Sequence, residues 1–234
     1  MSSDRVARIY DAVAQRDGDP SPMHRLEAIC HACLDLLPVD GAGVMLMAER
    51  AHQGTLYATD DRIQQLEELQ NSAAEGPCID SYNFGRPVLE ADLDTTGRSK
   101  WPLLSAAALK VGIRALFSFP LQLDDTSVGA LDLYRQTPGE LGPEQVADAR
   151  LLAAMATREV LALQALAAPG SLPDQIADLS GDRIIVEQAT GMVAAQIQAE
   201  ITEAARILRQ VATEQNRAVA EVARDIVSRT FRMS

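Results

Sequence analysis

Long apolar runs are missing from this sequence of 234 residues. A membrane-spanning helix needs about 18 or more consecutive apolar residues, and no such run occurs. The N-terminus also lacks the charged segment and apolar stretch that are typical of a secretory signal. We therefore expect a cytoplasmic protein that has no membrane partner.

Residues that carry common catalytic and metal chemistry are scarce or badly spaced. Three cysteines are too few for a disulfide framework, which is consistent with a reducing compartment. The histidines, His24, His31 and His52, do not have metal-ligand spacing. The chain has neither a Gly-x-Ser-x-Gly motif nor a phosphate-binding glycine loop. We therefore expect no catalytic residue, no metal site and no enzyme.

Basic residues are outnumbered and unevenly placed. The chain has 21 Lys and Arg residues against 33 Asp and Glu residues, which gives a net charge of -12. Residues 182–232 nonetheless balance seven arginines against seven acidic residues and contain no lysine. The charge deficit therefore belongs to residues 1–181, where it disfavours nonspecific contact with nucleic acid. Any nucleic-acid binding has to be localised in the C-terminal segment.

Apolar residues in this C-terminal segment recur with helical spacing in three stretches. The last stretch has five apolar residues at i, i+3, i+4, i+7 and i+8: Val219, Val222, Ala223, Ile226 and Val227. The middle stretch (204–212) and the first stretch (185–196) follow the same pattern. Because such short helices are stable only when they pack together, we predict a small three-helix bundle.

Several spaced blocks of this segment resemble the ANTAR domain, a bacterial three-helix module that binds RNA and prevents transcription termination. The blocks are Glu187-Gln188-Ala189-Thr190-Gly191-Met192-Val193, Leu208-Arg209, Asn216-Arg217 and Val222-Ala223-Arg224-Asp225-Ile226-Val227. Thr190 stands where the family usually has a basic residue. The resemblance implies that the partner is a leader RNA with two paired stem-loops.

An RNA-binding surface is predicted from these blocks and from arginines that lie off the apolar stripes. Arginine can pair with phosphates or stack on a splayed base. The alternative is that each arginine is an ordinary solvated charge, as Arg206 would be beside Glu203 at i−3. The predicted RNA contacts are Gln188, Ala189, Thr190, Gly191, Arg206, Arg209, Asn216, Arg217 and Arg224.

The first two thirds of the chain mix strand and helix patterns. Helical periodicity predicts helices that include residues 6–13, 22–37, 60–74, 101–110 and 146–166. Apolar or alternating runs predict strands over residues 42–48, 55–59, 87–90, 115–123 and 127–134. This order predicts an α+β fold in which helices flank an antiparallel sheet.

Motifs spread over residues 21–166 resemble the GAF domain, a ligand-sensing module. They are Glu75-Gly76-Pro77-Cys78, Gly85-Arg86-Pro87-Val88, Trp101-Pro102, Phe119-Pro120-Leu121 and Gly129-Ala130-Leu131-Asp132-Leu133-Tyr134. GAF domains bind varied small molecules and some only dimerise, so the resemblance implies an unidentified small-molecule ligand and no named cofactor. The ligand-cavity candidates are Cys78, Asp80, Tyr82 and Trp101.

The three cysteines and one aspartate allow more than one interpretation. Cys30 and Cys33 form a CxxC, but they share an apolar helical stripe with Leu26, which favours buried core thiols. Cys78 is expected near the start of a short helix, where a thiolate with a redox or ligand-contact role is favoured, but a packed thiol is the preferred interpretation. Asp132 alternates with apolar neighbours and is expected on the solvent or cavity-polar side rather than as a catalytic acid.

Composition divides the chain into four parts. Residues 1–20 form an N-terminal helix and linker, and residues 21–166 form the GAF-like domain. Residues 167–181 are a linker broken by proline and glycine, and residues 182–234 form the ANTAR-like domain. The long helix before the linker has more apolar surface than one sheet-packing face needs. This excess predicts a homodimer, although burial within the subunit explains it equally well.

Together these features predict a signal-responsive regulator of transcription antitermination. A signal sensed by the GAF-like domain would control an ANTAR module that binds tandem hairpins of a leader RNA. One alternative is a GAF-fold thiol enzyme, such as a free methionine sulfoxide reductase, with Cys78 as nucleophile and Cys30 or Cys33 as resolving thiol. Another is a dimeric sensor that acts through a protein partner instead of RNA.

Overall fold

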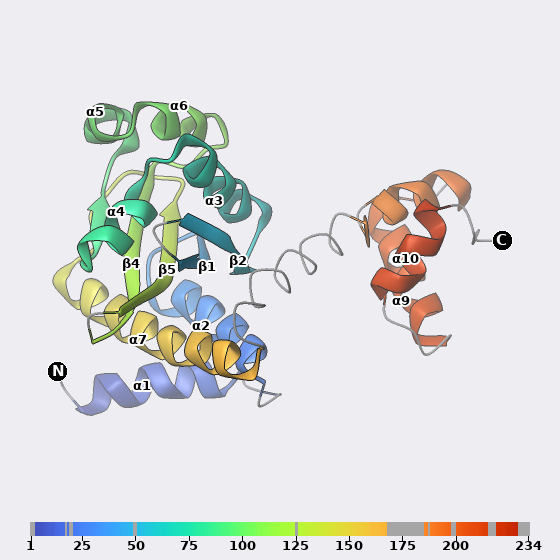
Figure 1. Cartoon of the computed structure of the whole chain (residues 1–234), viewed down its shortest axis with the longest axis horizontal. Helices are drawn as coiled ribbons and strands as arrows, with labels where there is room; N and C mark the ends of the chain where they lie inside the picture. The colour runs from blue at the N-terminus through green and yellow to red at the C-terminus, as the bar shows by residue number, and fades with distance from the viewer. Residues whose placement is uncertain are drawn as a thin grey trace. The chain divides into compact units, whose positions relative to one another are not determined.

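The computed structural model divides the chain into two compact units, residues 1–173 and residues 174–234 (Figure 1). The structure describes residues 3–16, 18, 21–48, 51–124, 126–167, 185–186, 188–197, 200–214 and 219–228. The predicted linker, residues 167–181, therefore lies outside the described residues except for Ala167. Among the described helices, none is both long and apolar enough to cross a membrane.

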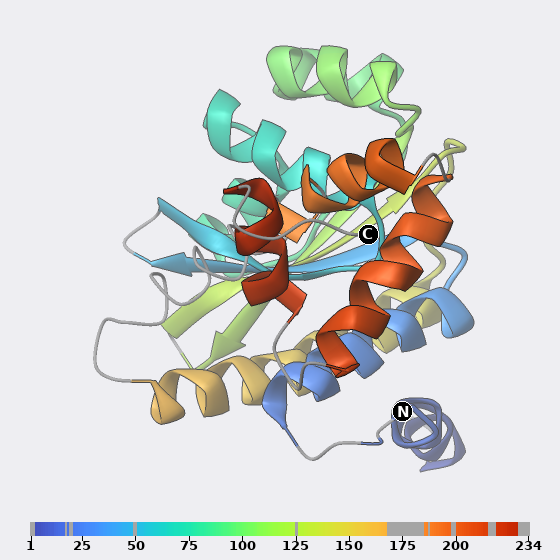
Figure 2. The ribbon, with the colours of Figure 1, turned by 90° about the vertical axis from the view of Figure 1, so that its right-hand side faces the viewer.

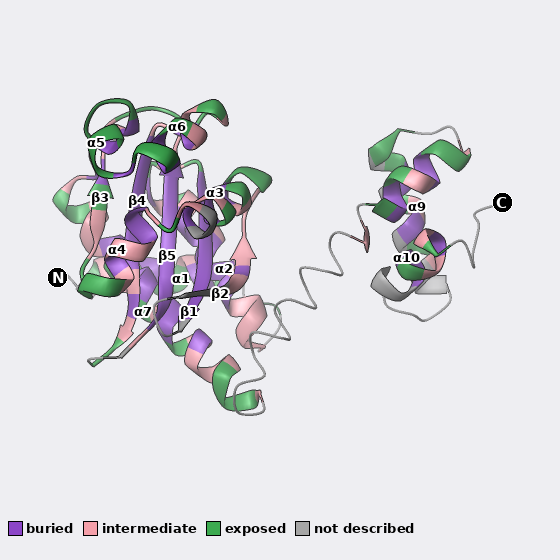
Figure 3. Ribbon diagram, turned by 45° about the horizontal axis from the view of Figure 1, so that its top comes forward, coloured by how far each residue is buried: buried purple, intermediate pink, exposed green. Residues whose placement is uncertain are grey.

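A five-stranded antiparallel sheet is the centre of the first unit. Its strands are β1 (Gly41–Ala48), β2 (Ala51–Ala58), β3 (Val88–Glu90), β4 (Ala115–Leu123) and β5 (Thr126–Arg135). The spatial order is β2-β1-β5-β4-β3, and every neighbouring pair is antiparallel. The central strands are buried on both faces (Figure 3). The predicted α+β fold with an antiparallel sheet is confirmed.

Two helices, α2 (Pro22–Leu36) and α7 (Pro143–Leu166), cover one face of this sheet (Figures 1 and 2). α2 begins as the sequence predicts, because the Ser21 hydroxyl accepts a hydrogen bond from the His24 backbone N–H at 3.3 Å and Pro22 follows the cap. α1 (Ser3–Ala14) packs on α2 from outside. It is also tied to α7, since Arg5 Nε donates to the buried Asp148 carboxylate at 2.5 Å.

The other face of the sheet carries several shorter helices (Figure 2). They are α3 (Asp61–Ala73), α4 (Pro77–Phe84), the π-helix η1 (Leu93–Gly97), α5 (Arg98–Lys100) and α6 (Pro102–Lys110). The sequence does not predict η1, because a five-residue turn is too short to have a recognisable apolar period. A local cap supports it: the Asp92 carboxylate accepts from the Asp94 backbone N–H at 3.0 Å, and Leu93 is fully buried.

The backbone of β1 lies close to β5 at Gly129. A Cβ atom at this position would lie 2.0 Å from the backbone oxygen of Met45. Only glycine allows this approach, because the obstructing atom belongs to the backbone and not to a flexible side chain. Gly129 therefore determines how β1, with Met45 and Met47, lies against the centre of the sheet.

The second unit is a small helical bundle. Its described helices are residues 188–197, α9 (Ile201–Glu214) and α10 (Val219–Val227). The three predicted apolar stripes meet in its core, where seven side chains are fully buried: Ala189, Val193, Ala204, Leu208, Val222, Ala223 and Ile226. The predicted packing of three helices is confirmed for the described part of this unit.

Candidate functional sites

Two arginines of the predicted RNA-binding surface are described with exposed side chains. Arg206 on α9 is 61% exposed and pairs with Glu203, one helical turn earlier, through Nη2 at 2.7 Å and Nε at 3.0 Å. Its Nη1 donates to Gln210 at 3.1 Å. Arg224 on α10 is also exposed. The Arg206 ion pair is solvent-exposed and weak, so a phosphate can replace the carboxylate at little cost.

The other predicted RNA contacts divide into surface positions, buried positions and positions outside the described residues. Gln188 and Gly191 are exposed, and a Cβ at Gly191 would meet no atom within 4 Å. Packing within the bundle therefore does not require glycine at Gly191. Asn216 and Arg217 lie outside the described residues, and for Arg209 only the helical backbone is described.

Ala189 and Thr190 need a correction, because the structure places both in the interior of the bundle. Ala189 is fully buried and Thr190 is 6% exposed. The Thr190 hydroxyl donates to the Val186 backbone oxygen at 2.7 Å, one turn back in the same helix. The family block that contains them is partly a packing motif. It therefore does not present all of its residues to a partner.

A buried polar cluster lies inside the first unit, between the sheet and α3. Asp132 of β5 and Ser118 of β4 are directly opposite each other in the ladder, and Ser118 donates to Asp132 Oδ1 at 2.5 Å. Gln70 of α3 donates to Asp132 Oδ2 at 2.7 Å and accepts from the Cys78 backbone N–H at 2.9 Å. Gln70 thus links the start of α4 to the centre of the sheet.

The electrostatics of this cluster favour protonated groups. Asp132 is fully buried, and burial raises its pKa to about 6, although hydrogen bonds from Ser118 and Gln70 oppose the rise. Burial also raises the pKa of Glu67 well above its usual value, and the charge of Asp132 adds to this effect. Asp132 therefore lies in the buried polar interior of the domain and not on the solvent side.

Glu67 fits beside the sheet because the neighbouring strand position is glycine. A Cβ at Gly43 would lie 2.3 Å from Glu67 Oε1, and Gly43 is the β1 partner of Asp132. Glu67 Oε2 accepts a hydrogen bond from Thr55, whereas Oε1 has no partner within the described part of the chain. The absence of a side chain at Gly43 therefore allows Glu67 to place a second carboxyl group near Asp132.

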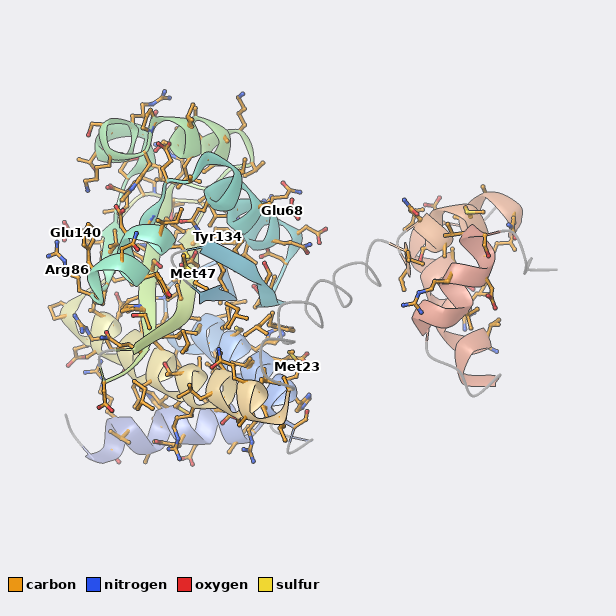
Figure 4. The ribbon with its side chains drawn as sticks, in the orientation of Figure 1. Met23, Met47, Glu68, Arg86, Tyr134 and Glu140 are labelled. Carbon is orange, nitrogen blue, oxygen red and sulfur yellow. The ribbon has the colours of Figure 1, made fainter. Side chains whose placement is uncertain are left out.

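Cys78 sits against this cluster and against two methionines. Its Sγ atom is 3.2 Å from Met45 Sδ and 3.7 Å from Met47 Sδ. Met47, which Figure 4 labels, lies on the sheet beneath α4. Burial raises the pKa of Cys78 well above its usual value, and the charges of Asp132 and Glu67 raise it further. The buried thiol agrees with the preferred interpretation of a packed thiol and disfavours a thiolate at this helix start.

The remaining ligand-cavity candidates form two separate groups. Tyr82 packs against the same small cluster as Cys78. Trp101 Nε1 instead donates to Asp80 Oδ2 at 3.0 Å, and Trp101 belongs to the core cluster beneath α6. Asp80 and Trp101 therefore join α4 to the start of α6. Sequence reasoning missed Met45, Met47, Glu67 and Gln70, because nothing in their local spacing separates them from ordinary core or helix residues.

Cys30 and Cys33 are core residues of α2, as predicted. Both are fully buried and form no disulfide. Burial raises the pKa of Cys33 to about 12 and that of Cys30 well above its usual value. α2 and α4 pack on opposite faces of the sheet (Figures 1 and 2), so the sheet separates this pair from Cys78.

Comparisons with known families agree with this division into two units. The GAF domain family (GAF_2) matches residues 24–158, and the ANTAR domain family matches residues 179–227. The fold and these matches define a regulatory protein in which a sensor-type domain precedes a helical domain. The chain belongs to the GAF domain family, and its C-terminal part is an ANTAR domain. No curated protein sequence matches the chain.

Solved structures resemble the first unit in fold. The GAF domain of an Acinetobacter phosphoenolpyruvate-protein phosphotransferase is 13% identical, with a TM-score of 0.56 over 72% of this chain and 99% of that one. The corresponding domain from Coxiella burnetii is 15% identical, with a TM-score of 0.55 over 70% and 98%. Reduced fRMsr of Staphylococcus aureus is 11% identical, with a TM-score of 0.50 over 68% and 96%. At such identities the similarity concerns the fold alone.

Proposed function

We propose that this protein is a signal-responsive antitermination regulator whose ANTAR domain binds tandem hairpins of a leader RNA. The observation that carries the proposal is the presence of a GAF domain and an ANTAR domain in one chain. The GAF domain supplies a buried polar interior in which a signal can act. The ANTAR domain supplies the effector, since the family it belongs to binds RNA and prevents termination.

The proposed RNA surface uses the exposed residues of the bundle. Arg206 and Arg224 supply guanidinium groups on α9 and α10, and Gln188 and Gly191 are exposed on the preceding helix. The proposed RNA contacts also include Arg209, Asn216 and Arg217, which rest on the family resemblance alone. Splayed loop bases can stack on arginine, and phosphates can take the place of Glu203 beside Arg206. Ala189 and Thr190 support this surface from within.

Replacing the exposed arginines is expected to weaken RNA binding. For Arg206→Ala and for Arg224→Ala we expect the Kd to rise about tenfold each, with a salt dependence shallower by about one ion per lost phosphate contact. Arg98→Ala is the matched control, because Arg98 is 57% exposed and also pairs with a carboxylate of its own helical segment in the other unit. The measurement is a titration of an RNA with two short-loop hairpins at several salt concentrations.

The same titration tests the proposal against nonspecific binding. An RNA with scrambled loops should bind much more weakly than the intact RNA. Equal affinity for both RNAs would refute specific hairpin recognition, and so would an equal loss in Arg98→Ala. A complete lack of RNA affinity in the native protein would favour the alternative of a sensor that acts through a protein partner.

A homodimer is the second part of the proposal, because two hairpins require two ANTAR modules. The C-terminal end of α7 supports it, since Leu166 is 75% exposed within the chain. We expect two chains on an RNA with two hairpins and one ANTAR module per hairpin. Sedimentation of the complexes measures this stoichiometry, and a single chain bound to the two-hairpin RNA would exclude the dimer.

Burial of all three thiols disfavours the alternative of a thiol enzyme. A disulfide-exchange reagent should find almost no reactive thiol in the native protein and three after denaturation, because Cys30, Cys33 and Cys78 are each fully buried. Ser99→Cys provides the positive control, since Ser99 is exposed. Rapid labelling of Cys78 together with Cys30 or Cys33 in the native protein would restore the enzyme as a candidate.

A further inference from the structure

Three sulfur atoms from two elements converge in the interior of the GAF domain. Cys78 is the second residue of α4, and its Sγ lies 3.2 Å from Met45 Sδ and 3.7 Å from Met47 Sδ. Met45 and Met47 come from β1 and are separated by one residue, so both can reach the same face of the sheet. The three residues, named here the sulfur cluster, are at most 2% exposed.

The surroundings of the sulfur cluster are apolar on one side and polar on the other. Ala130, on the neighbouring strand β5, is fully buried and packs with the three residues of the sulfur cluster. Asp132 lies beside the Cys78 thiol, and Glu67 lies nearby with an unpartnered, fully buried Oε1. The sulfur cluster is thus a dry donor set next to two buried carboxyl groups.

The donor atoms favour one class of metal. Thiolate and thioether ligands are soft and select Cu(I), whereas structural zinc sites use four thiolate or imidazole ligands. Within the described residues there is no group of three or more His, Cys, Asp or Glu side chains that could hold a metal ion. A zinc site is therefore not supported, and methionine is the residue that completes the donor set.

Charge balance leads to the same ion. A thiolate and Cu(I) together are neutral, so their burial avoids the large penalty for an unpaired charge in an apolar interior. A divalent ion on the same three ligands would leave one further positive charge, which only ionisation of a neighbouring carboxyl group could offset. The neutral thiol of the metal-free protein is thus replaced by a neutral copper–thiolate pair.

We propose that the sulfur cluster is a binding site for a single Cu(I) ion, held by the Cys78 thiolate and the Met45 and Met47 thioethers. On binding, the S–H bond of Cys78 breaks, a sulfur–copper bond forms, and the proton passes to the buffer. Copper stays Cu(I), and no electron is transferred. The site stands apart from the ANTAR domain, so its test does not depend on RNA binding.

The two sulfur separations from Cys78 need only a small adjustment. Metal–sulfur bonds of about 2.3 Å in a trigonal plane would place the sulfur atoms about 4 Å apart. The observed separations of 3.2 and 3.7 Å from Cys78 are shorter, so α4 has to move outward by less than about 1 Å. α4 is a short helix flanked by two glycines with positive φ, Gly76 (φ 144) and Gly85 (φ 61). The same movement would open the way to the sulfur atoms.

The test is an anaerobic titration of the full chain with Cu(I) in competition with bathocuproine disulfonate. We expect one Cu(I) per chain and three sulfur neighbours of copper in X-ray absorption. Cys78→Ser should weaken binding at least 100-fold, and Met47→Leu about tenfold. Leucine and methionine have similar volumes, so Met47→Leu should keep the fold intact. The fluorescence of Trp101, the single tryptophan, checks folding in each variant.

Two controls separate the sulfur cluster from other sulfur atoms. The double variant Cys30→Ala/Cys33→Ala removes the CxxC on the opposite face of the sheet, and Met23→Leu removes a methionine of α2. Both should bind Cu(I) as the native chain does. Unchanged affinity in Cys78→Ser, loss of binding in the CxxC double variant, or oxygen and nitrogen neighbours around copper would overturn the proposal.

Discussion

Gly129→Ala is expected to destabilise the GAF domain by about 3 kcal/mol or more, which is a large fraction of the stability of an ordinary domain. The added Cβ would lie 2.0 Å from the Met45 backbone oxygen and 3.1 Å from its carbonyl carbon. The conformation of Gly129 itself is not the obstacle, since its φ is not in the left-handed region. The steric contact between β5 and β1 alone produces the effect.

The measurement is urea unfolding followed by the fluorescence of Trp101, which is buried in the GAF domain. Gly142→Ala is the matched control, because a Cβ there would meet its nearest atom, Gln145 Oε1, at an ordinary 3.6 Å. We expect this control to change the unfolding free energy by no more than about 1 kcal/mol. Similar midpoints for Gly129→Ala and Gly142→Ala would contradict the close approach of β1 and β5.

The second large effect concerns the pH dependence of stability, to which Asp132 should make a strong contribution. Burial raises the pKa of Asp132 to about 6 from an ordinary value of 3.8. The folded state therefore holds the proton more tightly than the unfolded state. The resulting stabilisation is complete below pH 3.8 and is lost as the pH rises through about 6. This difference corresponds to about 3 kcal/mol of unfolding free energy.

Asp132→Asn should remove this contribution, since an amide does not titrate. The informative quantity is the difference in unfolding free energy between the native chain and the variant, measured from pH 4 to pH 7, because other carboxyl groups then cancel. It should change by about 2.4 kcal/mol over this range, in the direction that favours the native chain at low pH. Glu67, whose pKa is also raised by burial, should leave a residual slope of the same sign in the variant. A constant difference would mean that Asp132 is not a buried titrating group.

Much of the fold follows from local patterns in the sequence. The five strands and the helices around them have recognisable apolar periods, and Ser21-Pro22 marks the start of α2. The apolar stripes of the C-terminal helices likewise identify the core of the bundle. These features are predictable because each depends on the spacing of neighbours along the chain. The π-helix η1 is the exception, because it depends on one cap and one buried leucine.

The functional interior is different, because its residues come from distant segments. Gln70 and Glu67 read as polar residues of an exposed helix, yet both are fully buried beside Asp132. The positions of Glu67 and Gln70 in the helix do not reveal that Gly43 leaves room for the Glu67 side chain and Gly76 for the Gln70 side chain. The same reason explains Thr190, which the family block places at the RNA surface and the packing of the bundle places in its interior.

The order of an acidic sensor-type α+β domain and an arginine-containing three-helix module is predictable from the sequence, since periodicity, charge and motif spacing are properties of the chain. The state of Cys78 instead depends on tertiary packing. Its position after Gly76-Pro77 favours a thiolate, but burial against two methionines and two carboxyl groups makes the neutral thiol more stable. Desolvation and cross-sheet contacts arise only when distant segments meet, so no local pattern reports them.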